Sequence, residues 1–315
     1  MQDASPTPWG AAPPPATVRT IVPELPDLPP ARVVDGRVVF DAVTYARPTG
    51  FRPLLMDVHL PEELDGPAPC VVWIHGGAWR EGDRRFPPGN WGQDDSWFRL
   101  LVGSGMAVAT IDYRLSGEAR YPAQLADAQA AIRFLRHHAN PLGIDPNRIG
   151  VCGESAGGHL AALVALTGDS PVAWTDRSVV GPSSAVAAAV LMYPVTDLLA
   201  FGPEGPDGGG DELWAGPHPE DILLGQRATQ APDAAMAASP VAHVHGAAPP
   251  MLLLHGAEDT LVPPGHSERL AAALARVGAA VRLELVSGGE HCFVGADPLP
   301  PLNAAVAFLA EHLGA

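Results

Sequence analysis

The sequence predicts an α/β fold in which a mostly parallel sheet of eight strands is flanked by helices. Two observations predict this class. Short apolar runs of strand length alternate with longer runs of helical periodicity, and this alternation is typical of parallel sheets. The chain also has 315 residues, of which 47% are hydrophobic, so it can bury one sizeable core without a second domain.

The expected strands are short apolar runs, several of them bounded by glycine or proline. In chain order they are Val33–Tyr45, Leu54–Leu60, Cys70–Ile74, Met106–Ile111, Ile149–Cys152, Val186–Tyr193, Met251–His255 and Val281–Val286. Helical periodicity appears between or after the later strands, in Ala123–His138, His159–Leu166, Gly265–Arg276 and Leu302–His312.

The N-terminal segment falls outside this alternation. Residues 1–32 are rich in proline and alanine and are expected to form either a flexible arm or an extended cap segment. Ile21, Leu25 and Leu28 would be the apolar anchors of such a cap. The domain itself is assigned to residues 33–315.

A second interruption covers residues 196–240, which include a glycine-rich stretch. Loops of this length are usually functional or disordered, so the segment is predicted to be a small lid, with a surface excursion as the alternative. Trp79, Trp91 and Trp97 would either line the pocket or pack in the core.

The stretch Gly153–Gly157 reads Gly-Glu-Ser-Ala-Gly and joins a predicted strand to a predicted helix. In this setting the pattern predicts a tight turn that raises the serine hydroxyl above the sheet edge, at the positive end of a helix. Glycine is needed on both sides because larger side chains would collide. The sequence therefore predicts Ser155 as a nucleophile.

A second glycine-rich loop follows the strand Cys70–Ile74. It reads His-Gly-Gly, and it lies at the carboxyl end of the strand, where ligands bind in open parallel sheets. Acyl transfer needs N–H donors for the charge that develops on the carbonyl oxygen. Gly76 and Gly77 are predicted as such donors, together with the amide of Ala156.

An acid and a histidine follow the last two predicted strands. Asp259 and His291 both come after Ser155 in the chain, which is the order of this type of triad. His291 would take the serine proton, and Asp259 would hold the tautomer of the imidazole and stabilise its charged form. Glu258 and Glu290 are the less suitable alternatives for the acid.

Since only one histidine can be the catalytic base, most of the twelve histidines must have a different role. His75 is expected to anchor its loop by hydrogen bonds, and His159 to pack or cap one turn after the nucleophile. His255 is expected to have a structural role at a strand end.

On the basis of these residues, the chain resembles proteins of the α/β-hydrolase fold, and among them the esterase branch related to hormone-sensitive lipase. It is similar there to small bacterial esterases that act on acetyl, feruloyl or polyol esters. The resemblance implies the triad Ser155, Asp259 and His291. It also implies the oxyanion donors already named, and it runs from about residue 35 to the end. The matching motifs are residues 75–79, 111–115, 121–124, 153–158, 255–259 and 289–291.

The expected function is a serine carboxylesterase that hydrolyses short-chain acyl esters of small alcohols, sugars or polyols, without a cofactor or metal. An amidase of the arylformamidase type is the alternative within the same chemistry. A non-catalytic ligand-binding protein on the same fold is the alternative from another class. Alanine at position 78 and glutamate at position 154 depart from the lipase-like pattern and favour the sugar or polyol side.

The composition restricts the kinds of molecule that the protein is expected to bind and the location that is expected for it. The net charge of −16 argues against a nucleic-acid partner and favours neutral esters. Three cysteines do not suggest a disulfide framework. No basic leader and no apolar run of membrane-spanning length is apparent, so a cytoplasmic location is expected. The oligomeric state, including a homodimer, is left open.

Overall fold

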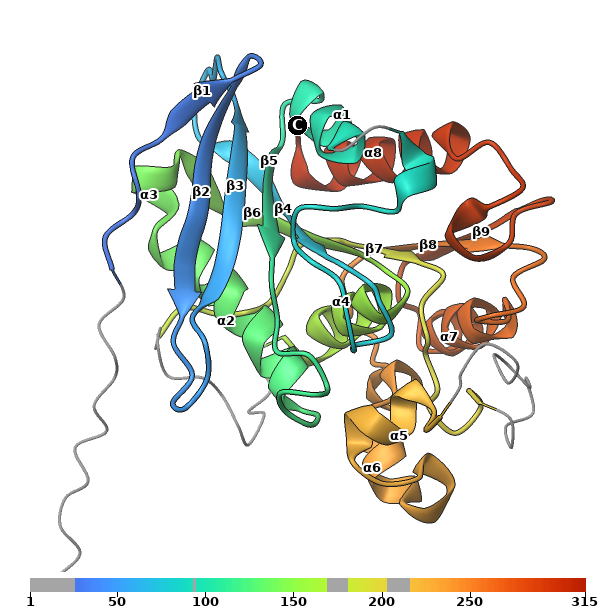
Figure 1. The fold of residues 1–315 in the computed structure, drawn as a ribbon. Helices are drawn as coiled ribbons and strands as arrows, with labels where there is room; N and C mark the ends of the chain where they lie inside the picture. The colour runs from blue at the N-terminus through green and yellow to red at the C-terminus, as the bar shows by residue number, and fades with distance from the viewer. Residues whose placement is uncertain (1–25, 93–94, 169–180, 203–215) are drawn as a thin grey trace, which may run out of the picture.

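The computed structural model describes residues 26–92, 95–168, 181–202 and 216–315. Within these ranges one nine-stranded sheet has the order β1-β2-β3-β5-β4-β6-β7-β8-β9 (Figure 1). The strands are β1 (Arg32–Val34), β2 (Arg37–Ala46), β3 (Leu54–Pro61), β4 (Ala68–Ile74), β5 (Ala107–Ile111), β6 (Ile144–Glu154), β7 (Ala189–Met192), β8 (Met251–Gly256) and β9 (Val281–Val286).

The sheet is parallel from β5 to β9, and β1, β2 and β3 pair antiparallel at one side. The carboxyl ends of β4, β6, β8 and β9 therefore lie at the same edge. Loops that leave this edge can converge on one site, as expected for an open parallel sheet. The prediction of a mostly parallel sheet flanked by helices is confirmed.

The sheet has one strand more than predicted within the described residues. The run Val33–Tyr45 was expected to be continuous, but it divides into β1 and β2. Asp35 and Gly36 form the turn between them, with φ of 49° and 72°. Asp-Gly with positive φ at both positions is the turn that two-residue hairpins prefer. The ninth strand is therefore a consequence of a local signal that the apolar pattern concealed.

Helices cover both faces of the sheet (Figure 1). One hydrophobic cluster joins α2, α4 and α7 to one face, and a second cluster joins α1 and α8 to the other. Adjacent strand residues alternate between the clusters, because successive side chains point to opposite faces. The helices are α1 (Ser96–Gly103), α2 (Ala123–His137), α3 (Ala139–Leu142), α4 (Ala156–Thr167), α5 (Pro219–Leu224), α6 (Pro232–Ala237), α7 (Gly265–Arg276) and α8 (Leu299–Leu313).

Between β7 and β8 the chain forms a group of short elements, which we call the cap. It contains α5, α6 and the 3-10 turns η2 (Ala228–Gln230) and η3 (Pro240–His243). Two further 3-10 turns, η1 (Gly89–Trp91) and η4 (His291–Phe293), lie elsewhere. Figure 1 shows α5 and α6 together, beyond α4 and α7.

Of the predicted N-terminal anchors, Leu28 packs partly buried against the core. Ile21 and Leu25 lie outside the described residues. In the part of the chain that the structure describes, every helix is too short or too polar to cross a bilayer.

Candidate active site

The turn between β6 and α4 carries Ser155. Its backbone has φ of 52° and ψ of −120°, which is strained for a residue with a side chain. A Cβ atom on Gly157 would lie 2.0 Å from the carbonyl oxygen of Ile74, and one on Gly153 would lie 2.3 Å from the carbonyl oxygen of Gly157. Both glycines are therefore required by close backbone contacts, as the sequence predicted.

The structure brings together the three side chains of the predicted triad. Nε2 of His291 lies 3.0 Å from Oγ of Ser155. Nδ1 of the same ring lies 2.7 Å from Oδ2 of Asp259. We assign the ring proton to Nδ1, which donates to the carboxylate, so that Nε2 is free to accept the serine hydroxyl proton. This is the geometry of a nucleophile, a base and an orienting acid.

The buried carboxylate of Asp259 is held on both oxygens. Oδ1 accepts hydrogen bonds from the amides of Leu261 at 3.0 Å and Val262 at 2.8 Å. Oδ2 faces His291 and also lies 3.4 Å from Nε2 of His255. Burial alone would raise the pKa of Asp259, but the hydrogen bonds with His255 and His291 outweigh it and lower the pKa to about 2. The group therefore remains a carboxylate at neutral pH.

The loop that carries His291 is fixed from a distant segment. Cys292 has φ of 59°, and its carbonyl oxygen accepts hydrogen bonds from Nδ2 of Asn90 at 2.8 Å and Nε1 of Trp91 at 3.0 Å. The Trp91 ring also stacks on Phe293. Sequence reasoning missed this support, because about two hundred residues separate the partners and neither segment carries a recognisable motif.

The loop after β4 differs from the prediction at one position. The amide of Gly76 donates a hydrogen bond of 2.6 Å to Oε1 of Glu154, which is buried. Gly76 is thus occupied and does not point a free N–H at the nucleophile. In the described residues, the next two amides, of Gly77 and Ala78, have no hydrogen-bond acceptor. Ala156 begins α4, where the first amides of a helix have no partner within it.

His75 anchors this loop, as expected. Its ring stacks on Tyr113 with 4.4 Å between centroids, and Nδ1 lies 2.8 Å from the carbonyl oxygen of Gly76. The Tyr113 hydroxyl donates to the carbonyl oxygens of His75 and Gly76. Burial lowers the pKa of His75, so the ring is neutral and packs as part of the loop.

His159 joins the same loop to the cap. Its Nδ1 accepts a hydrogen bond from Nε1 of Trp79 at 3.1 Å, and its Nε2 donates to the carbonyl oxygen of Ala238 at 2.7 Å. Burial lowers the pKa of His159 to about 4, so the neutral ring with a proton on Nε2 fits both partners. The predicted packing role is confirmed, and the ring also bridges two parts of the site.

A cavity of about 330 Å³ opens beside Ser155 and His291. Its wall is mostly apolar and includes Trp79, with the further apolar residues Ala78, Phe86, Pro87, Pro88, Ala156, Val195, Phe201, Pro219, Leu261 and Val262. Trp91 and Trp97 instead pack with Trp73 in the core behind the sheet. Of the three tryptophans considered above, one lines the cavity and two are core residues.

Known proteins resemble this chain in sequence and in fold. Esterase LipQ of Mycobacterium tuberculosis is 32% identical over 247 residues, which is 78% of this chain and 55% of LipQ. A truncated carbohydrate esterase from gut microbiota superposes with a TM-score of 0.75 and 26% identity, over 91% of this chain and 100% of that one. An acetyl ester-xyloside bifunctional hydrolase from Caldicellulosiruptor lactoaceticus has a TM-score of 0.66 and 27% identity, over 84% and 90% of the two chains.

The chain thus spans only about half the length of LipQ, one of the curated relatives that it matches. The BD-FAE family model matches residues 56–274, which contain Ser155 and Asp259 and end before His291. This match covers most of the chain, and the similar structures share its sheet flanked by helices. The chain belongs to the BD-FAE family, in the branch of the α/β-hydrolase fold related to hormone-sensitive lipase.

Proposed function

We propose that this protein is a serine carboxylesterase. The observation that carries the proposal is the continuous hydrogen-bonded chain from Ser155 through His291 to Asp259, at the edge of an apolar cavity. Oγ of Ser155 attacks the ester carbonyl carbon while Nε2 of His291 takes its proton. The imidazolium then protonates the leaving alcohol, and a water molecule, deprotonated by His291, releases the acid from the acyl-enzyme.

The negative charge of each tetrahedral intermediate needs aligned N–H donors. We assign this role to the amides of Gly77 and Ala156, and we add Ala78 in place of Gly76. The support is that the Gly76 amide is bound to Glu154, whereas Gly77 and Ala78 have no acceptor in the described residues. A single donor of this kind is typically worth about 3 kcal/mol in the transition state.

The proposed substrates are esters with short acyl groups, of the acetyl type. A cavity of about 330 Å³ lies near the lower limit for ligand sites, and its apolar wall suits a short hydrocarbon chain. The similar structures described as a carbohydrate esterase and an acetyl ester-xyloside hydrolase also favour acetyl esters of sugars or polyols. Of the predicted lid, residues 203–215 lie outside the described residues, and the cap helices α5 and α6 are the part that would cover the substrate.

The test is hydrolysis of p-nitrophenyl acetate, butyrate, octanoate and laurate by the wild type and by Ser155→Ala. We expect turnover that falls with chain length and that depends on Ser155. Equal turnover by the variant would contradict the proposal.

N-Formylkynurenine separates the amidase alternative from the esterase. Preference for this amide over acetate esters would favour an arylformamidase. Failure of both substrates, and of serine labelling by a fluorophosphonate, would favour a non-catalytic ligand-binding protein.

A further inference from the structure

The two edges of the sheet differ in how well they are protected against another strand. At one edge, β1 has only three residues and belongs to a tight hairpin with β2. At the other edge, β9 pairs with β8 over six residues in one unbroken register, without a bulge or a proline (Figure 1). In the described part of the chain, no strand lies beyond β9. A long, regular edge of this kind is normally shortened, bent or covered, because its unpaired backbone groups attract another strand.

The backbone groups that β9 turns outward follow from its pairing with β8. The carbonyl oxygens of Ala280 and Val286 both accept hydrogen bonds from amides of β8 and the loop after it. In a parallel pair, alternate residues of a strand direct both their polar groups to the same neighbour. The even-numbered residues therefore bond to β8, and Val281, Leu283 and Leu285 present their amides and carbonyl oxygens at the free edge.

The charged side chains of β9 favour a second copy of the same strand as its partner. Arg282 and Glu284 form an ion pair on the sheet face opposite to Leu283, and their side chains are 63% and 31% exposed. When a copy of β9 runs antiparallel about a two-fold axis at Leu283, Arg282 of each chain faces the partner's Glu284. The joined strands then carry a square of four alternating charges, and opposite charges directly across two strands attract.

The same axis also satisfies the backbone and covers an exposed leucine. It pairs Leu283 with its own copy and Val281 with the partner's Leu285, so every outward amide and carbonyl oxygen meets an outward partner. Leu285, which is 43% exposed, becomes covered. An axis one residue away on either side would instead place Arg282 against Arg282 or Glu284 against Glu284, where like charges repel. The sequence of β9 thus selects one register of self-pairing.

We propose that β9 is a dimer interface, at which a second copy of this chain pairs antiparallel with Leu283 at the two-fold axis. One continuous sheet then crosses both chains. The carboxyl ends of the two β9 strands point in opposite directions, so the two active sites open at opposite edges of the joined sheet. The interface does not depend on the esterase function proposed above.

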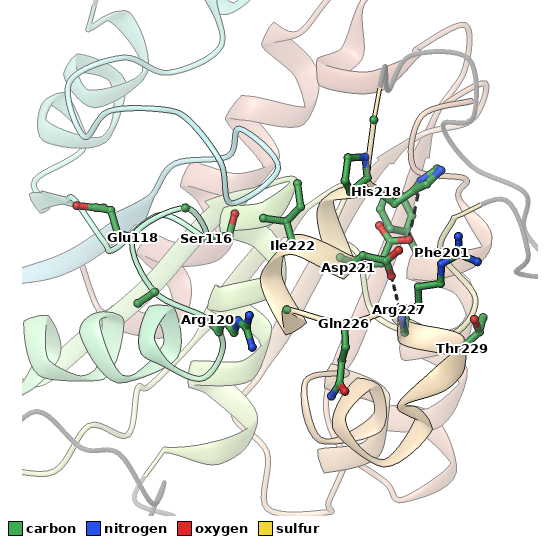
Figure 2. A pocket seen from close by; sticks show the side chains of 17 residues that line it. Ser116, Glu118, Arg120, Phe201, His218, Asp221, Ile222, Gln226, Arg227 and Thr229 are labelled. Atoms are coloured by element: carbon green, nitrogen blue, oxygen red, sulfur yellow. Dashed lines mark hydrogen bonds and ion pairs between the residues drawn. The ribbon is translucent and has the colours of Figure 1, made fainter.

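The interface is separate from the cavities near the cap. The catalytic cavity is lined by no residue of β9. A larger cavity of about 1030 Å³ lies between the loop of residues 116–120 and the cap elements α5 and η2, and β9 does not line it either (Figure 2). Disruption of the edge should therefore leave the turnover of p-nitrophenyl acetate per chain close to wild type, which serves as a check that the variants are folded.

The first test is a cysteine crosslink that depends on the register. In the proposed pairing, Leu283 and its copy form a hydrogen-bonded pair with a Cα separation of about 5.5 Å, which a disulfide can span. Leu283→Cys should therefore give a disulfide-linked dimer under mild oxidation, measured on a non-reducing gel. Leu285→Cys is the matched control, because the two copies of this residue would be offset by about 14 Å along the strands and should not crosslink. The wild type controls for its own cysteines.

The second test measures the dissociation constant of the dimer by sedimentation. Arg282→Glu should weaken the dimer about tenfold, because it turns two attractive pairs into repulsive ones. Adding Glu284→Arg to this variant should restore wild-type association. Leu283→Pro removes an outward amide without touching the bonds to β8, and it should give monomers.

Three results would overturn the interface. These are a monomeric wild type, a crosslink in Leu285→Cys but not in Leu283→Cys, and a dimer that Arg282→Glu leaves unchanged. The last result would show that another surface, or another segment of the chain, makes the contact between copies.

Discussion

The active site has two walls that are built differently. On the sheet side, the side chains of Ser155, Asp259 and His291 follow strand ends, and they are held by hydrogen bonds that are buried or partly buried. On the cap side, α5 and α6 have only six residues each. The cap is joined to the domain by buried apolar side chains, such as Leu223 and Ala235, and by hydrogen bonds such as that of His159 with the carbonyl oxygen of Ala238.

This difference separates chemistry from selectivity. Under the proposed function, the sheet edge would hold the reacting groups in a fixed geometry, and the cap would shape the space for the rest of the substrate. Changes on the sheet side should therefore lower turnover on every ester. Changes on the cap side should instead alter stability or the preference among esters, and the following variants test this division.

The largest effect is expected for Ser155→Ala. Loss of the nucleophile should lower kcat by about 10⁴–10⁶ on all p-nitrophenyl esters, because acyl transfer then has no covalent route. Circular dichroism should show an unchanged fold. A variant that kept a tenth of the wild-type rate would place the nucleophile elsewhere on the sheet edge.

His159 should make the link between the two walls sensitive to acid. Its pKa is lowered from 6.5 to about 4 by burial, so between these values the unfolded chain binds more protons than the folded one. The contribution of His159 to the free energy of unfolding should therefore be greatest above pH 6.5, and it should fall by about 3 kcal/mol as the pH drops to 4.

The measurement is urea unfolding from pH 7 to pH 4 in the wild type and in His159→Gln. Glutamine can accept from Trp79 and donate to Ala238, but it does not titrate. The variant should show a shallower pH dependence, and other buried histidines contribute equally to both proteins. Identical slopes would show that His159 does not couple the walls in this way.

Glu154 is expected to act as a positioning residue on the sheet side. Glu154→Ala leaves the amide of Gly76 without its acceptor and should lower kcat about 10- to 100-fold, less than removal of a donor that binds the oxyanion itself. Glu154→Gln retains an acceptor oxygen and should recover most of the rate. Equal losses in the two variants would contradict the hydrogen-bond role, and the KM for p-nitrophenyl acetate should change little in either.

The smallest effect is expected on the cap side for Tyr121→Phe. The Tyr121 hydroxyl donates to the carbonyl oxygen of Ala237 at 3.0 Å, near the end of α6. Removing this exposed hydrogen bond should cost about 1 kcal/mol of unfolding free energy or less. The rate on p-nitrophenyl acetate should stay close to wild type. A large loss of turnover would mean that the cap also holds the reacting groups.

The sequence predicted that Ser155, Asp259 and His291 would meet, because each follows a strand in a short local pattern, and the structure brings the three side chains together. The need for Gly153 and Gly157 can be predicted in this way, because the backbone contacts that require them lie next to the turn that carries Ser155. The Asp35-Gly36 hairpin was equally local, but the apolar run around it was interpreted as one strand. Local patterns therefore predict both the tight turn that carries Ser155 and, with closer attention, the extra strand.

The remaining features depend on distant contacts. Whether Gly76 or Ala78 offers a free amide is decided by Glu154, which is 78 residues away in the chain. The support of the His291 loop comes from Asn90, 202 residues away. Cavity shape likewise depends on how the cap packs, which no short pattern encodes. These contacts are set by tertiary packing, and a single sequence does not display them.

The most direct test of the central claim is labelling with a fluorophosphonate, followed by intact-mass measurement and peptide mapping. The account predicts one adduct per chain at Ser155, formed rapidly in the wild type and absent from Ser155→Ala. It also predicts slow labelling in His291→Ala, because the serine then lacks its base. An adduct on another residue, or none in the wild type, would contradict the assignment of Ser155 as the nucleophile.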